Sequence, residues 1–108
     1  MSHRVRKNSA FLHLLSDCHP KQRKVLLETL TDEQLKTLCE VVLNILKGII
    51  HLSPRQQQKL RKKKRVLYQL VSKSTPSKTK KRLLVQEGGS VLPSILIPAL
   101  QVLGSLLI

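Results

Sequence analysis

The histidines and cysteines are the side chains of this sequence that could hold a metal ion or act as nucleophile and base: His3, His13, His19, His51, Cys18 and Cys39. Their intervals match no usual spacing of zinc ligands, and the two cysteines form no CxxC pair. The sequence also lacks P-loop, GxGxxG and GxSxG motifs. We therefore expect no enzymatic activity, no metal and no cofactor, and free thiols in a reducing compartment.

Basic side chains offer a second kind of chemistry, the binding of anions. Between Arg55 and Gln86 the chain carries twelve Lys or Arg and no Asp or Glu, whereas the other eight basic residues lie among five acids before Pro54. The formal net charge of +14 on 108 residues indicates a polyanionic partner. The residues expected to bind it are Arg55, Lys59, Arg61, Lys62, Lys63, Lys64, Arg65, Lys78, Lys80, Lys81 and Arg82.

The composition favours contacts with phosphate groups over contacts with bases. Phe11 and Tyr68 are the two aromatic residues, so the stacking surfaces that bind single strands are nearly absent. We expect binding to nucleic acid without sequence preference, with duplex DNA as the partner. The strings RKKKR and KTKKR also resemble nuclear import signals, and import can coexist with polyanion binding. No signal peptide is predicted at the N-terminus.

The C-terminal residues 88–108 contain no charged side chain, so we expect this tail to be buried in something. A helix from Pro93 to Ile108 would rise about 24 Å, short of the roughly 30 Å hydrocarbon core, and Pro98 would kink it. Three options stay open: packing on the N-terminal helices or oligomerisation, docking on another protein, and insertion into an anionic membrane surface. The expected contacts are Leu92, Ile95, Leu96, Ile97, Leu100, Leu103, Leu106 and Leu107.

Three helices are predicted to follow one another within residues 8–52. Asn8 or Ser9 would cap the first, and Pro20 would open the second. For the third, Thr31 and Gln34 form a capping box, with Leu30 and Leu35 as a hydrophobic staple. The predicted apolar positions are Phe11, Leu12, Leu14, Leu15, Val25, Leu26, Leu27, Leu30, Leu35, Leu38, Cys39, Val42, Ile45, Leu46 and Ile49.

The basic segment is predicted to begin as a helix after a left-handed stop at Gly48. Ser53 and Gln56 form a second capping box, with Pro54 at the first helical position. Five consecutive basic residues interrupt its apolar positions, so we expect the middle of this helix to project into solvent. Residues 72–80 are predicted to be a polar linker, and residues 80–87 to add one or two helical turns. The apolar positions are Leu60, Leu67, Leu70 and Val71.

These patterns predict an all-α protein, a small bundle of three to four helices with a basic helical extension and an apolar C-terminal tail. The expected organisation is a flexible basic arm at residues 1–7, a helical core at 8–52, a polyanion-binding basic helix and linker at 53–87, and the tail at 88–108.

One string resembles a known family. GGSVLPSILIPAL, directly after the basic segment, resembles the C-terminal part of the adenovirus core protein X precursor. The wider order of LLETLTDEQLKTL, NILKGIIHLS, KKKR and QEGG is similar to small proteins of Maverick or Polinton elements and adintoviruses. The resemblance implies a virion component bound to the viral genome, with a tail that an adenain-type protease processes or that contacts capsid or membrane. Gln86 stands where such proteases prefer a large aliphatic residue, so we expect an intact tail.

The sequence therefore predicts a non-enzymatic structural protein of a virus-like element that binds and condenses DNA, in the virion and the host nucleus. The alternative is a membrane-associated or membrane-disrupting protein at an intracellular membrane surface, with the basic segment on anionic lipid. A further alternative is a helical adaptor of the host in which the basic run only directs import.

Overall fold

The computed structural model describes residues 3–48 and 52–87, and these form seven helices without a strand. The prediction of an all-helical protein is confirmed. The sequence predicted three to four helices with a basic helical extension, and the additional helices arise because residues 3–7 are helical and the first part of the basic segment is divided at Lys63. The helices are α1 (His3–Lys7), α2 (Ser9–Asp17), α3 (Pro20–Glu28), α4 (Asp32–Leu46), α5 (Pro54–Lys62), α6 (Lys64–Val71) and α7 (Ser77–Glu87).

The longest helix, α4, begins at the predicted capping box. The backbone N–H of Gln34 donates to Thr31 Oγ1 at 3.1 Å, and the N–H of Thr31 donates to Gln34 Oε1 at 3.0 Å. After α4 ends, Gly48 has a φ of 77°, the left-handed conformation expected there. The predicted stripe is confirmed except at Ile49, which lies outside the described residues. The residues that α4 buries are Leu35, Thr37, Leu38, Val41, Val42 and Ile45.

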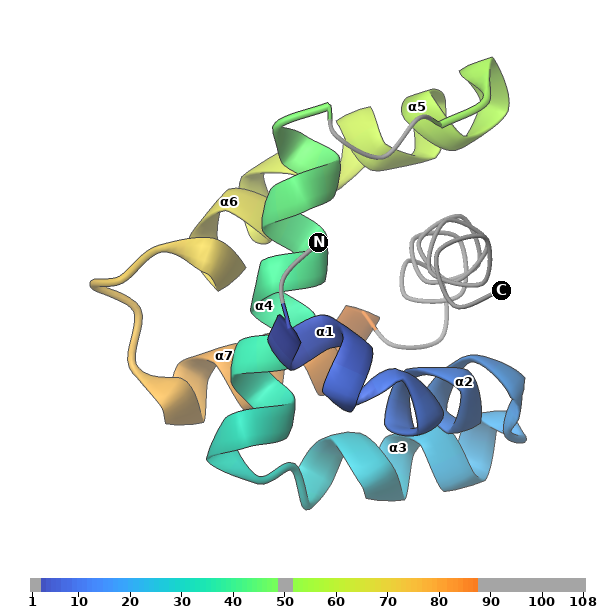
Figure 1. Cartoon of the computed structure of the whole chain (residues 1–108). Helices are drawn as coiled ribbons and strands as arrows, with labels where there is room; N and C mark the ends of the chain where they lie inside the picture. Colours follow the sequence, from blue (N-terminus) through green and yellow to red (C-terminus); the bar gives the residue numbers. More distant parts are fainter. Residues whose placement is uncertain (1–2, 49–51, 88–108) are drawn as a thin grey trace.

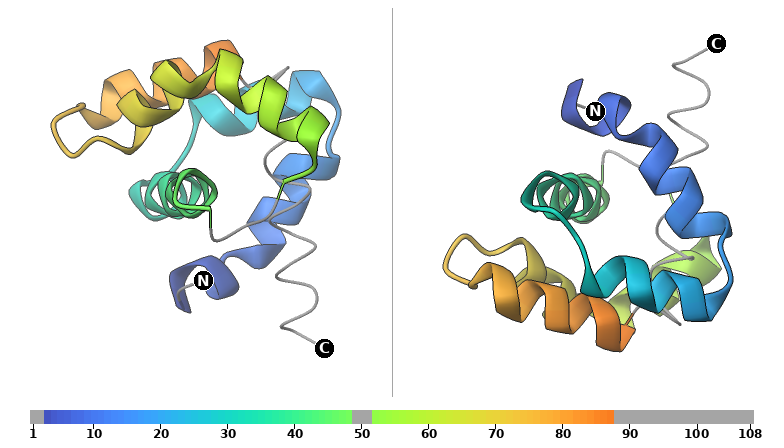
Figure 2. Two further views of the ribbon diagram at one scale, coloured as in Figure 1. Left: turned by 90° about the horizontal axis from the view of Figure 1, so that it is seen from above. Right: turned by 90° about the horizontal axis from the view of Figure 1, so that it is seen from below.

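Figure 2 shows α4 end-on in both views, with α5, α6 and α7 on one side of it and α1 on another. In Figure 1, α5 lies near the C-terminal end of α4, and α3 and α7 lie near its N-terminal end. Helices α1, α6 and α7 pack directly on α4, and α7 also packs on α3 and α6. The core is one cluster of aliphatic side chains drawn from every helix except α5.

The N-terminal segment is not the flexible arm that the sequence predicted, since residues 3–7 form α1. Val5 is fully buried in the core cluster, and α1 packs on α4. The Asn8 side chain donates to the Arg4 carbonyl at 2.8 Å, and Arg4 Nε lies 3.4 Å from Glu33 Oε1. The prediction was wrong because a single apolar residue, Val5, gives no periodic pattern in the sequence. In the structure, the burial of Val5 and these polar contacts stabilise the short helix α1.

The basic segment contributes to the core more than its local polarity suggested. Leu67 and Leu70 of α6 and Leu84 of α7 are all at most 4% exposed and belong to the same cluster as the α4 residues. The linker is also shorter than predicted, because α7 begins at Ser77, directly after Pro76. Helix α5 is the part that remains an extension, since it buries no residue.

Two predicted apolar positions face solvent instead of the core. Leu14 of α2 is 53% exposed and Val25 of α3 is 58% exposed. They line a shallow apolar hollow together with Cys18 and Leu26. In these helices nearby residues are buried in the core instead, Leu15 in α2 and Leu27 in α3.

Arg23 joins α2 to α3 from within the core. Its side chain is 7% exposed, and its guanidinium donates to three backbone carbonyls at the end of α2: Leu15 at 2.9 Å, Ser16 at 3.1 Å and Cys18 at 3.1 Å. Carbonyls at the end of a helix lack backbone partners within it and carry the negative end of the helix dipole. The guanidinium donates hydrogen bonds to these carbonyls, and its positive charge is attracted to the dipole. The contact fixes the angle at which α3 leaves α2.

Candidate nucleic-acid interface

Helix α5 begins at the second predicted capping box. The N–H of Gln56 donates to Ser53 Oγ at 3.2 Å, the N–H of Ser53 donates to Gln56 Oε1 at 2.8 Å, and Pro54 is the first helical residue. These bonds satisfy the amide groups at the start of a helix that has no buried side chain. The capping box therefore helps to hold a short, strongly basic helix that tertiary packing alone would hold weakly.

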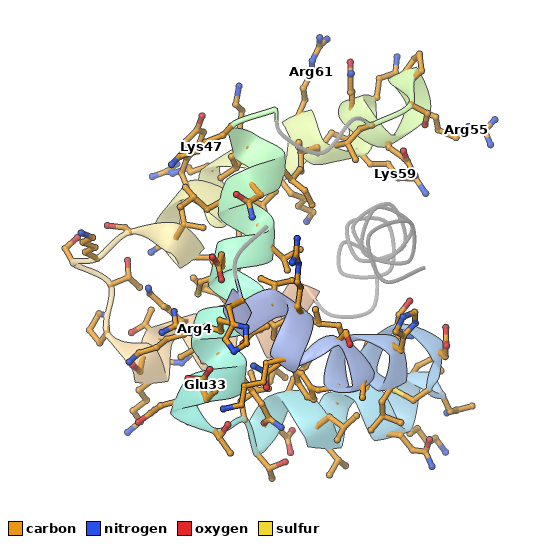
Figure 3. All side chains as sticks on the ribbon, in the orientation of Figure 1. Arg4, Glu33, Lys47, Arg55, Lys59 and Arg61 are labelled. Atoms are coloured by element: carbon orange, nitrogen blue, oxygen red, sulfur yellow. The ribbon has the colours of Figure 1, made fainter. Side chains whose placement is uncertain are left out.

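The basic residues of α5 form what we call the α5 basic cluster: Arg55, Lys59, Arg61 and Lys62, all exposed. Arg55, Lys59 and Lys62 are four and three residues apart and so share one side of the helix. Leu60, on another side, is partly buried against the core. Figure 3 shows Arg55 at the far end of α5 and Arg61 pointing away from the body of the molecule. This arrangement leaves the positive charges free of acidic neighbours on their own helix.

The run of five basic residues breaks the helix that the sequence predicted as continuous. Lys63, with φ −112° and ψ 11°, separates α5 from α6, and its N–H donates to the Leu60 carbonyl at 3.0 Å. Beyond the break, Lys64 Nζ lies 5.9 Å from the centroid of the half-exposed Tyr68 ring, a cation–π distance. The break turns α6 so that Leu67 and Leu70 reach the core while Lys64 and Arg65 stay exposed.

The second half of the predicted site lies on α7 and forms what we call the α7 basic cluster: Lys78, Lys80, Lys81 and Arg82. Lys78 and Arg82 are exposed and four residues apart, whereas Lys80 and Lys81 are half-buried beside the buried Leu84. Lys80 lines a hollow of about 310 Å³ with Arg4, Asp32, Lys36 and Ser77 among its other lining residues. The structure therefore adds Arg4 and Lys36, which sequence reasoning did not assign, to the surroundings of this cluster.

Cys39 lines the same hollow, and its surroundings shift the pKa of its thiol. Burial raises the pKa of the Cys39 thiol above its ordinary value, and the nearby charge of Lys80 opposes this increase. The thiol also donates to the Leu70 carbonyl at 3.5 Å. Cys39 therefore behaves as a core residue, and both Cys39 and Cys18 are free thiols.

The predicted binding residues are thus not brought together in one surface. Arg61 and Lys64 line a hollow with Ile45, Leu46 and Gly48, at the C-terminal end of α4. Lys80 instead lies beside Asp32 and Leu35, in the first turn of α4. Figure 3 places Lys47 at the same end of α4 as Arg61. The sequence did not predict Lys47 as a binding residue because it lies outside the basic segment. Arg61 and Lys80, one residue from each cluster, therefore lie near different ends of α4.

The predicted contacts of the tail, from Leu92 to Leu107, lie outside the described residues. Within residues 3–48 and 52–87, no helix combines the length and apolarity that crossing a bilayer requires. In the same part of the chain, no three His, Cys, Asp or Glu side chains gather as ligands for a metal ion.

Comparison of the chain with protein-family models, with curated proteins and with solved structures gave no significant match in any of the three.

Proposed function

We propose that this protein binds duplex DNA without sequence preference, through phosphate contacts made by the α5 basic cluster and the adjoining residues Lys64 and Arg65. The observation that supports this most directly is the exposed row of Arg55, Lys59 and Lys62 on a helix without an acidic residue or a buried side chain. A polyanion approaching this helix meets several fixed positive charges at once. Release of counterions from the DNA then supplies the binding free energy.

The mode of action is stoichiometric. The basic side chains offer positive charge and hydrogen-bond donors, which position a phosphate backbone but do not read a base sequence. Tyr68 is engaged with Lys64 and is the one aromatic side chain on these helices, so stacking on single-stranded bases contributes little. We accordingly propose duplex DNA as the partner and no chemical turnover.

The biological setting that we propose rests on the sequence resemblance alone. GGSVLPSILIPAL and the basic segment before it resemble the adenovirus core protein X precursor and small proteins of Maverick or Polinton elements and adintoviruses. A structural protein that accompanies the DNA of such an element, in the virion and the host nucleus, would need this kind of nonspecific binding. The apolar tail would then dock on capsid or membrane.

The binding proposal is tested by titrating a labelled duplex with the full chain at several salt concentrations, using fluorescence anisotropy. About six phosphate contacts predict a slope of log K against log salt near −5. In the variant Arg55→Gln/Lys59→Gln/Lys62→Gln, three of these contacts are lost, so we expect a slope of about −2.5. The matched control Arg6→Gln/Lys7→Gln/Lys21→Gln removes the same charge from α1 and α3, where all three side chains are exposed.

Two results would overturn the proposal. One is equal loss of affinity in the α5 variant and in the control, because binding would then depend on net charge alone. The other is binding of the full chain to anionic phosphatidylserine vesicles with no binding to duplex DNA at about 0.15 M salt, which would support the membrane-associated alternative.

A further inference from the structure

The apolar hollow between α2 and α3 is a surface that the proposed DNA binding does not use. Helices α2 and α3 pack on each other, and Figure 1 shows them side by side at one edge of the molecule. The hollow measures about 480 Å³. Leu14 and Val25 line it with more than half of their surface exposed, and Cys18 and Leu26 add to its apolar lining. Large aliphatic side chains that are exposed together on neighbouring helices form a candidate surface for contact with another protein.

Helix α3 carries opposite charges on the two sides of Val25. Lys21, Val25 and Glu28 are four and three residues apart, so they lie along one side of the helix. All three are exposed, whereas Arg23 and Leu27, which face the other way, are buried. The outward side of α3 therefore has a cation in its first turn, an apolar residue in the middle and an anion at its last residue.

This pattern is complementary to itself when two α3 helices pair in antiparallel orientation. A two-fold axis that passes between Lys24 and Val25 places Lys21 of each copy at the level of Glu28 of the other. Each of these two residues lies about 5 Å from the axis along the helix, at 1.5 Å per residue. Both ion pairs can therefore form at once, with Val25 of the two copies between them.

The charge of the molecule also favours this surface for contact between two copies. The net charge of +14 opposes association wherever basic side chains face each other. On α2 and α3, however, the exposed Lys, Arg, Asp and Glu side chains balance: Lys21 and Lys24 against Asp17 and Glu28. Two copies can therefore approach through α2 and α3 with less repulsion than through the α5 basic cluster.

We propose that the α2–α3 surface binds a second copy of this chain, forming a symmetric dimer with Leu14 and Val25 at its centre and a Lys21–Glu28 ion pair on each side. The aliphatic side chains of each copy enter the hollow of the other. Two helices of nine residues offer a small contact area, so we expect a weak dimer of the transient kind. The dimer goes beyond the proposed function and does not depend on DNA binding.

Sedimentation velocity of the full chain without DNA, over a range of protein concentrations, measures the dissociation constant of the dimer. Sodium chloride at about 0.15 M reduces the Debye length to about 8 Å, which screens the long-range repulsion between the two molecules. The variants are Lys21→Glu, Glu28→Lys and Lys21→Glu/Glu28→Lys. These changes suit the dipole of α3, since they place an anion at its start and a cation at its end, and circular dichroism checks that each variant folds. The matched control Lys7→Glu makes the same charge change at an exposed residue of α1.

Each single reversal replaces two attractive pairs by two repulsive ones, so we expect the dissociation constant to rise about tenfold. Lys21→Glu should have this effect although it lowers the net charge, whereas Lys7→Glu should not weaken the dimer. The double variant restores both pairs with their signs exchanged and should recover the wild-type dissociation constant.

A wild-type chain that stays monomeric at every concentration would overturn the inference, and it is the result expected if residues 88–108 fill the hollow instead. Dimerisation that neither single reversal weakens would overturn it too, because the copies would then meet through another surface. The same conclusion would follow from a double variant that associates no better than the single variants.

Discussion

At the scale of single residues, Arg23 shows how a buried cation is accommodated without a carboxylate. Its acceptors in the described part of the chain are three carbonyls at the end of α2, and the fork of the guanidinium lets one side chain reach all three. The negative end of the helix dipole adds to the attraction. A side chain that replaces Arg23 must either reach the same carbonyls or lose these three hydrogen bonds, in which case the Leu15 carbonyl keeps the contact from the Cys18 thiol at 3.6 Å.

We therefore predict that Arg23→Lys lowers the free energy of unfolding by about 1–3 kcal/mol, because an ammonium group cannot serve three separate carbonyls and the hydrogen bonds that it loses are buried or partly buried. Urea denaturation monitored by circular dichroism measures this value. The matched control Arg6→Lys makes the same chemical change at an exposed position, where we expect a change within about 0.5 kcal/mol. Equal stability of the two variants would show that the carbonyl contacts contribute nothing.

At the scale of elements, α7 both carries a basic cluster and contributes to the hydrophobic core, although its composition is mostly polar. Its first half carries the basic cluster, and its second half places Leu84, only 2% exposed, among the side chains of the core. The helix packs on α3, α4 and α6, so it closes one side of the bundle. The positions of its lysines therefore depend on the packing of Leu84 and of Val85, which is partly buried against the same cluster.

This arrangement predicts that Leu84→Ala lowers the free energy of unfolding by about 2–5 kcal/mol, the cost of removing a buried leucine side chain from a packed core. Val25→Ala, on the exposed side of α3, should change it by no more than about 0.5 kcal/mol. Thermal and urea unfolding of both variants tests the difference. If Leu84→Ala unfolded at the same urea concentration as the wild type, α7 would not belong to the cooperative core.

At the scale of the whole molecule, the net charge of +14 opposes the compact state. The Arg4–Glu33 ion pair is exposed, and such a pair contributes at most about 1 kcal/mol. Repulsion among the many basic side chains therefore outweighs attraction. Removing charge from α5 should stabilise the fold even as it weakens DNA binding.

Accordingly, the free energy of unfolding should rise when sodium chloride increases from about 10 mM to about 150 mM, as the Debye length falls from about 30 Å to about 8 Å. The rise should be smaller for Arg55→Gln/Lys59→Gln/Lys62→Gln, which lacks three of the repelling charges. Urea titrations at each salt concentration measure both effects. A decrease in stability with salt would mean that attractive ion pairs dominate instead.

Local sequence signals determined the helical class, the starts of α4 and α5 and the left-handed Gly48, because a capping box and a glycine stop act within a few residues. They also determined the charge and its confinement to residues 55–86. A flexible arm was predicted where α1 forms, because burial of Val5 depends on contact with α4, a helix 25 residues further along the chain, and leaves no periodic pattern.

Only the tertiary structure decided how the basic residues are shared between surfaces. Of the twelve basic residues between Arg55 and Gln86, eight form the α5 and α7 basic clusters. The two clusters are carried by separate helices because Leu67 and Leu70 of α6 and Leu84 of α7 pack into one core from either side of the loop at residues 72–76. The same packing brings Lys36 beside Lys80. The sequence gives the position of each charge along the chain. The surface on which that charge lies depends on which apolar side chains of the same helix are buried in the core.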